Sequence, residues 1–301
     1  MKDLVIVEFP SNLGLKETAP GQEPGVRRLP AWLQKHGLHA ALSPAKVYSL
    51  EAPPYDSRRD PQNGYLNPTA LATYAMQQAA LLGGVLNNEQ FPFILGGDCS
   101  ILLGTALALK QRGNYGLFYL DGHTDFMDIS LSETGGVGGM VASLVTGNGA
   151  AQLSNMASLS PYICEEDLCC VGNREYDAVY EAAIQGSKAT YVSLAELRRQ
   201  GIHVITSNFL DRVARRQPDG FWLHIDVDVL NDEIMPCVDS RTPDGLHYAE
   251  FNELCGYLFS SPLLAGIEIT ILDPDRDPDG KHTKAFVSNI SETFNSSRKT
   301  V

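Results

Sequence analysis

The sequence has neither a long apolar run nor an excess of basic residues, and both absences exclude classes of protein. No stretch approaches the roughly 18 to 20 apolar residues that a membrane-spanning helix needs. The formal net charge is −13, with 23 Lys and Arg against 36 Asp and Glu. Because phosphate groups are bound by basic surfaces, this balance disfavours nucleic acid and anionic lipid as partners. An acidic surface suits a small cationic substrate instead.

The cysteines and the first residues lack a signature as well. The six cysteines include no pair of C-x-x-C units of the kind that binds structural zinc, and no secretory context accompanies them. Residues 1–10 read MKDLVIVEFP, which is typical of an opening strand, with no long apolar region or small-residue cleavage site behind it. We therefore expect a cytoplasmic protein.

Short apolar runs rich in β-branched residues alternate with helical stretches, a pattern typical of a parallel sheet. The expected strands are residues 4–7, 93–95, 117–120, 168–171, 189–192, 221–225 and 264–269. The expected helices are residues 24–35, 68–87, 101–111, 175–185, 193–200, 206–215 and 248–259. The chain is 301 residues long and 44% hydrophobic, and it shows no fixed-period repeat or evident linker. These features predict one α/β domain over residues 1–301, with residues 51–65 as a surface loop.

Three polar clusters follow apolar runs, where ligands bind in parallel α/β folds. They read GGDCS after residue 95, DGHTD after residue 120 and DVD after residue 225. In the second cluster Asp121, His123 and Asp125 occupy alternate positions, so all three can face one side of an extended segment. Asp226 and Asp228 repeat this spacing.

Four carboxylates and one imidazole at one sheet edge would repel one another without a cation, because like charges a few ångströms apart cannot all stay ionised. A pair of divalent metal ions resolves this repulsion. Carboxylate and imidazole ligands suit manganese, with bridging aspartates and a bridging water that becomes the hydroxide nucleophile. The sequence therefore predicts a binuclear metal site.

Residues 96–100, 121–125 and 225–228 resemble the signatures GGDHS, DAHxD and SxDxDxxDP of the ureohydrolase superfamily, which includes arginase, agmatinase and formiminoglutamase. The likeness covers most of the chain, from residues 24–38 to TPDGL at residues 242–246. The resemblance implies a single three-layer αβα domain with a parallel sheet of about eight strands. It also implies two divalent ions, foremost Mn²⁺, and a homo-oligomer, either a trimer or a hexamer.

Position by position, the resemblance implies that Asp121 and Asp226 bridge the metals and that Asp125 shares the first metal. His123 and Asp228 would bind the second metal. The implied reaction is hydrolysis of a C–N bond in a linear guanidino or amidino compound. Asp121, Asp125 and Asp226 are then the expected catalytic residues.

Two positions depart from the superfamily pattern. Cys99 stands where the superfamily has a histidine ligand to the first metal. A thiolate suits zinc, nickel or iron better than manganese, so Cys99 is either a ligand to a softer ion or a small buried thiol. Gly138 stands in place of the proton-shuttling histidine. A branch that hydrolyses N-hydroxyarginine resembles this chain at both positions; a better leaving group, or His224 or His247, could make up for the missing general acid.

The substrate positions also depart from the pattern. Glu175 keeps an acid that could face a substrate amine, whereas Met127 replaces an asparagine that arginase uses. The superfamily's guanidinium-binding glutamate falls on Ile271. Glu268, within the same apolar run, is either a substrate-binding residue reached by a shifted strand or a structural ion-pair partner. Ordinary arginine is therefore not the expected substrate.

The leading hypothesis is a metal-dependent amidinohydrolase, because five metal ligands of the superfamily are retained. The rival is a non-catalytic binding or regulatory relative with weakened metal binding, which the losses at the ligand, shuttle and guanidinium positions favour. A third reading, amide deacetylation on the related histone deacetylase architecture, is disfavoured because those enzymes use a single zinc ion and a different motif set.

Overall fold

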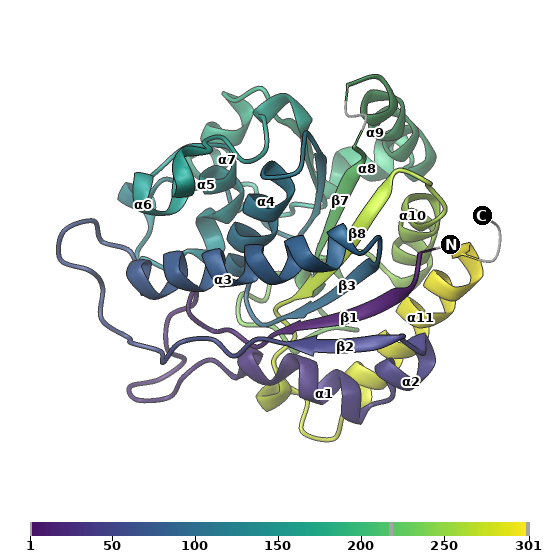
Figure 1. Cartoon of the computed structure of the whole chain (residues 1–301), viewed down its shortest axis with the longest axis horizontal. Coiled ribbons are helices and arrows are strands. Elements are labelled where there is room, and N and C mark those ends of the chain that lie inside the picture. Colours follow the sequence, from purple (N-terminus) through teal and green to yellow (C-terminus); the bar gives the residue numbers. More distant parts are fainter. Residues whose placement is uncertain (1, 217–218, 299–301) are drawn as a thin grey trace.

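The computed structural model describes residues 2–216 and 219–298, and the strands of these residues form one parallel sheet. The order across the sheet is β2-β1-β3-β8-β7-β4-β5-β6 (Figure 1). The strands are β1 Leu4–Phe9, β2 Lys46–Ser49, β3 Phe91–Gly96, β4 Gly116–Leu120, β5 Leu168–Val171, β6 Thr190–Val192, β7 Phe221–Asp226 and β8 Leu264–Thr270. This confirms the expected α/β fold with a sheet of about eight parallel strands.

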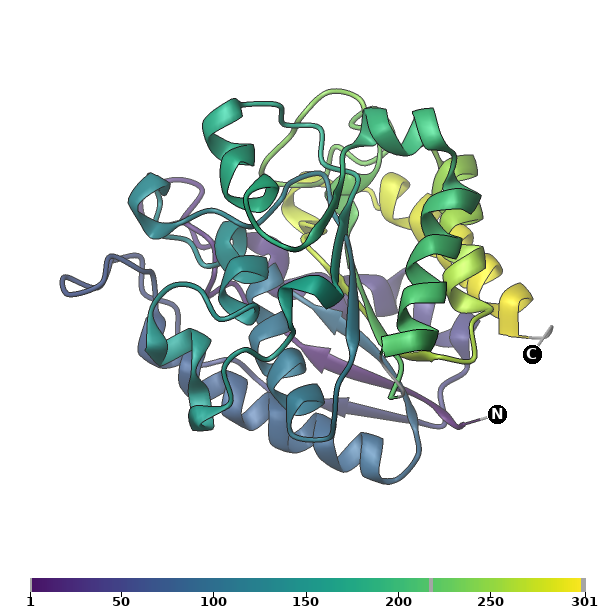
Figure 2. The ribbon, with the colours of Figure 1, turned by 90° about the horizontal axis from the view of Figure 1, so that it is seen from above.

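Two groups of helices cover the sheet, and Figures 1 and 2 show them on opposite faces. The first group is α3 Pro68–Asn87, α4 Leu102–Lys110, α5 Val141–Val145 and α6 Ala151–Ser154. The second is α1 Leu29–Lys35, α2 Leu38–Leu42, α9 Ile202–Arg216, α10 Tyr248–Phe259 and α11 Lys281–Arg298. The remaining helices are α7 Ala178–Gln185 and α8 Leu194–Gln200. Within the described residues, no helix is long and apolar enough to cross a membrane.

The predicted elements are present with small shifts, whereas β2, α11 and the short helices α2, α5 and α6 were not predicted. All seven expected strands occur, and α3 and α10 have the predicted bounds. The expected helix at residues 24–35 is divided into a 3-10 turn and α1, and residues 51–65 form an irregular loop as predicted. The missed β2 is a short, mostly exposed edge strand. The missed α11 is rich in polar residues and buries Phe286, Ile290 and Phe294 on one face.

The middle of the sheet positions the site. Strands β3, β8, β7 and β4 are neighbours, and all of them run in the same direction. Their carboxyl ends, and the segments that follow them, therefore meet at one edge. These strands are almost wholly buried, which fits the continuous apolar runs of a sheet covered on both faces.

Candidate metal centre

The segment after β3 holds Cys99 at the base of the site. Gly97 lies so close to the chain that a β-carbon there would overlap the carbonyl oxygen of Ser11. Buried Asp98 accepts hydrogen bonds from the backbone N–H groups of Ser100 (2.8 Å) and Gly14 (3.2 Å). Asp98 is thus an anchor between two loops, and it fixes the position of its neighbour Cys99.

Cys99 is buried against carboxylates. Its thiol donates to Asp226 Oδ2 at 3.0 Å, and its sulfur lies 3.1 Å from Thr270 Oγ1. Burial raises the pKa of the Cys99 thiol well above its usual range, and the charges of Asp226 and Asp125 raise it further. Without a cation, the thiol therefore keeps its proton.

The segment after β4 brings two carboxyl groups into the same space. Asp121 Oδ1 accepts from the His123 backbone N–H at 2.6 Å, whereas Asp121 Oδ2 is buried and has no hydrogen-bond partner among the described residues. Asp125 has a left-handed backbone, with φ of 45°, and accepts a hydrogen bond from the Tyr119 hydroxyl. Burial and the charge of Asp121 raise the pKa of Asp125 well above its usual range.

The segment after β7 completes the group. Asp226 Oδ1 accepts from the Asp228 backbone N–H at 2.8 Å, and Asp228 Oδ1 accepts from the Gly122 N–H at 3.0 Å. Asp228 Oδ2 lies 2.9 Å from His123 Nδ1. Burial alone would lower the pKa of His123, but the carboxylates of Asp228 and Asp121 raise it well above its usual range.

These contacts fit divalent cations. Burial and neighbouring carboxylates raise the pKa values of Asp121, Asp125 and Asp226, so the protein by itself does not stabilise their ionised forms. Ligand atoms of Asp121, His123 and Asp228 lie within 4.8 Å of one another. The unpartnered oxygen of Asp121 is the kind of buried polar atom that calls for a bound group.

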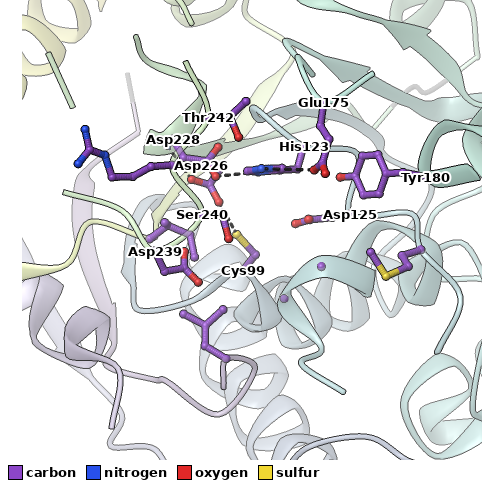
Figure 3. Close-up of a pocket in the computed structure, with 16 residues that line it drawn as sticks. Cys99, His123, Asp125, Glu175, Tyr180, Asp226, Asp228, Asp239, Ser240 and Thr242 are labelled. Atoms are coloured by element: carbon purple, nitrogen blue, oxygen red, sulfur yellow. Dashed lines mark hydrogen bonds and ion pairs between the residues drawn. The ribbon is translucent and has the colours of Figure 1, made fainter. Parts of the chain in front are cut away.

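A cavity of about 330 Å³ opens above this cluster. Figure 3 shows the labelled carboxyl groups, His123 and Cys99 gathered around it. The lining residues are Leu15, Cys99, His123, Asp125, Met127, Gly138, Gly139, Glu175, Tyr180, Asp226, Asp228, Asp239, Ser240, Arg241, Thr242 and Ile271. The expected residues Cys99, His123, Asp125, Glu175, Asp226 and Asp228 are therefore brought together, with Asp121 bonded to the His123 backbone beside them.

Glu268 is not brought to the cavity. It is fully buried and lies 2.6 Å from His224 Nδ1 through Oε1, while its other oxygen accepts from the Thr105 hydroxyl at 2.7 Å. These contacts agree with the second alternative for Glu268, in which it is a structural ion-pair partner. Glu268 therefore does not line this cavity, whereas Ile271, which follows β8 directly, does.

Four polar residues of the cavity wall were not anticipated from the sequence: Tyr180, Asp239, Ser240 and Arg241. Asp239 comes from the irregular segment between β7 and α10; its position between the DVD and TPDGL motifs was a usable signal. Tyr180 comes from α7, and its hydroxyl accepts from the Thr124 N–H at 2.6 Å. An aromatic residue in a helical pattern gives no such signal. Neither His224 nor His247, the alternative proton shuttles, lines the cavity.

Fold and site together define an α/β protein with an acidic cavity, lined by candidate metal ligands, beyond the carboxyl ends of its central strands. The sequence model of the arginase family matches residues 2–294. The chain belongs to the arginase family, and the resemblance to the ureohydrolase superfamily is confirmed. The narrower resemblance to the N-hydroxyarginine-hydrolysing branch stays a prediction.

Several relatives support this placement. The chain is 28% identical over 207 residues to the arginase of Bacillus subtilis, covering 68% of this chain and 69% of the relative. The structure of the arginase of Bacillus caldovelox superposes with a TM-score of 0.87 at 23% identity and 98% coverage of both chains. The formimidoylglutamase of Bacillus subtilis superposes with a TM-score of 0.72 at 22% identity, covering 98% of this chain and 87% of that one. These two structural likenesses show the fold alone.

Proposed function

We propose that residues 1–301 form one catalytic domain that hydrolyses a C–N bond of a linear guanidino or amidino compound with two divalent metal ions. The observation that carries this proposal is the buried, unpartnered Oδ2 of Asp121 within a cluster of carboxyl groups whose pKa values are raised. Such a cluster is stable in its ionised form only when a cation neutralises it.

Six side chains would hold the ions. Asp121 and Asp226 lie between the two halves of the cluster, Cys99 and Asp125 on one side, and His123 and Asp228 on the other. Two bound divalent ions supply a nucleophile at neutral pH by lowering the pKa of a water molecule. Manganese suits the oxygen-rich side, whereas the Cys99 sulfur suits a softer ion.

Asp125 is the candidate to receive a proton from the nucleophile. Its Oδ2 accepts a hydrogen bond from the Tyr119 hydroxyl. Its Oδ1 faces Gly139, which has no side chain that could cover this oxygen. An ionised carboxylate in that position can accept a proton, which is the chemistry that a general base supplies.

The cavity wall selects a cationic substrate other than arginine. Glu175 and Asp239 provide negative charge at the wall, and the Glu175 side chain is 46% exposed, so it can meet a substrate amine at the opening. Ile271 and Met127 are apolar where arginase has hydrogen-bonding residues. An N-hydroxyguanidine or an amidine fits this wall better, and the Tyr180 hydroxyl is placed to donate to a departing amine.

The test has two parts. Metal analysis of the purified protein under reducing conditions should find bound or bindable divalent ions. The Asp226→Asn variant should not hold two ions at the same time. Release of urea, ammonia or amine should then be measured from a panel of guanidino, N-hydroxyguanidino and amidino compounds with added Mn²⁺, Zn²⁺ or Ni²⁺. A protein that binds metal but releases no product from any of them would be the non-catalytic relative.

A further inference from the structure

Three side chains form a layer directly beneath the metal centre. Tyr119 on β4, His224 on β7 and Glu268 on β8 are register partners across the sheet, and all three are fully buried. The His224 ring stacks on Tyr119, with centroids 4.4 Å apart and an interplanar angle of 5°. Two positions further along the chain lie Asp121, Asp226 and Thr270, at or directly after the carboxyl ends of these strands. Side chains two positions apart in a strand point to the same face, so the layer lies directly below the site.

The contacts of His224 fix its proton. Nδ1 lies 2.6 Å from Glu268 Oε1, and the Thr105 hydroxyl donates to the other oxygen of the same carboxylate. Because a carboxylate only accepts hydrogen bonds, Nδ1 donates to Glu268, and Nε2 is the ring nitrogen that points away from it. Nε2 is 3.4 Å from Thr270 Oγ1, which is longer than a normal hydrogen bond. Nε2 is therefore the ring atom placed to meet a further partner.

The free nitrogen faces the Cys99 side of the metal centre. Thr270 Oγ1, next to Nε2, is 3.1 Å from the Cys99 sulfur. Ligand atoms of Cys99, Asp121 and His224 lie within 4.8 Å of one another, and all three residues are buried. In a tetrahedral zinc site with bond lengths near 2.3 Å to sulfur and 2.1 Å to nitrogen, two ligand atoms lie roughly 3.6 Å apart. Side-chain movements of up to about 1 Å would bring the three ligand atoms to that spacing.

We propose that His224 is a ligand of the first metal through Nε2, together with Cys99 and Asp121, and that Glu268 positions it. The inference rests on the proposed binuclear function. Metal-bound histidines commonly donate their other N–H to a carboxylate, which orients the ring and raises its basicity, and Glu268 stands in that relation to His224. His224 on β7 would thus supply the imidazole that the superfamily has at position 99. Its side chain lies below the metal ligands that follow the strands.

The ligand set also selects the metal. Sulfur, imidazole nitrogen and carboxylate oxygen together suit zinc or cobalt better than manganese. The other side of the cluster, with His123 and Asp228, keeps the oxygen-rich set. We therefore expect a mixed site in which Zn²⁺ occupies the Cys99 side first.

The experiment is a crystal structure of the full wild-type chain loaded with Zn²⁺, with the ions located by anomalous scattering. His224 Nε2 at about 2.0 to 2.1 Å from the ion beside Cys99 would establish the ligand. An ion beside Cys99 with Nε2 still directed at Thr270 would overturn this inference and leave the proposed function standing. Absence of any bound ion would overturn both.

Cobalt titration under reducing conditions provides a second measurement in solution. The thiolate-to-cobalt absorption should be lost in Cys99→Ser and kept in Cys255→Ser, a buried thiol of α10. Glu268→Gln should weaken Co²⁺ binding at this site about 10- to 100-fold. The double variant His224→Phe/Glu268→Leu removes both partners together, so neither is left buried without the other. It should lose this site while keeping the other. Unchanged affinity in both variants would contradict the role of His224.

Discussion

At residue 138 the cavity wall has no side chain, and the proposed hydrolase would lack a proton donor at this position. Gly138 lines the cavity, and a β-carbon there would lie 3.1 Å from the end of the Leu15 side chain, which can move aside. We expect Gly138→His to increase kcat about 10- to 100-fold on substrates with poor leaving groups, because general acid catalysis is restored. Gly138→Ala is the matched control; an equal effect of both substitutions would contradict the assignment.

Tyr180 is one of three hydroxyl residues that line the cavity, together with Ser240 and Thr242. We expect Tyr180→Phe to lower kcat about tenfold while KM changes little, because the hydroxyl acts on the departing amine. Tyr176→Phe, an exposed neighbour, should have no effect. Steady-state kinetics on the same compound will distinguish the roles: a rise in KM without a change in kcat would make Tyr180 a substrate-binding residue only.

The sequence predicts which carboxyl groups lie together, because these residues follow buried strands directly. Asp121, Asp226 and their partners occupy fixed positions after apolar runs, so topology alone places them together. Tyr180 reaches the cavity only through the packing of α7, which no local pattern encodes. Glu268 shows the opposite difficulty, because an acid within an apolar strand is compatible with either face until its partner His224 is known.

At the scale of elements, α3 and α4 pack at unusually close range. A β-carbon at Gly104 would lie 2.5 Å from the Gln78 side chain and 3.0 Å from the Ala75 carbonyl, whereas nothing lies within 4 Å of one at Gly84. We expect Gly104→Ala to destabilise the protein by about 1–3 kcal/mol through overpacking. Gly84→Ala should stabilise it by about 0.5–1 kcal/mol through helix propensity. Denaturant unfolding measures both, and equal signs would contradict this packing.

Arg198 of α8 ties together the segment that leads from the site to α10. It binds Asp244 and Glu250 at 2.8 Å each, and its hydrogen bonds lower the pKa of Glu250; burial alone would raise the pKa of Asp244, but Arg198 lowers it. A depressed pKa stabilises the fold above the unfolded value, here 4.5 for Glu250, and this stabilisation is lost as pH falls through the folded value.

We therefore expect Arg198→Gln to lose about 1 kcal/mol of stability at pH 7, a modest figure because the pairs are partly exposed. The difference from wild type should shrink as pH falls below about 4.5, where the acids become protonated. Unfolding curves at several pH values will check this. A difference that is constant down to pH 3 would mean that Arg198 acts through packing rather than charge.

Element prediction succeeded where burial imposes a clear pattern and failed at the margins of the fold. Strands β3, β4 and β7 are buried on both faces and appear as continuous apolar runs. The edge strand β2 and the amphipathic α11 carry mostly polar residues, and their positions depend on partners distant in sequence. Their assignment therefore requires the tertiary structure.

At the scale of the whole molecule, metal binding should stabilise the fold. Ions that bind only the native state contribute about 2.7 kcal/mol at a free concentration of 100 times Kd. We expect Zn²⁺ or Mn²⁺ to raise Tm under reducing conditions and EDTA to reverse the rise. Asp226→Asn should lose most of the increase because that residue lies between the two halves of the cluster. A Tm that is insensitive to every divalent ion would contradict the metal site.

The contact between the first strand and the last helix has a consequence for chain connectivity. Arg298 Nη2 at the end of α11 donates to the Lys2 carbonyl at 3.1 Å, and Figure 1 shows β1 and α11 leading to neighbouring ends. A short peptide could join these ends without moving either element. New ends opened in the exposed loop around residue 58 would then yield a circular permutant with the same sheet order, in which β1 and α11 are neighbours in sequence as well as in space.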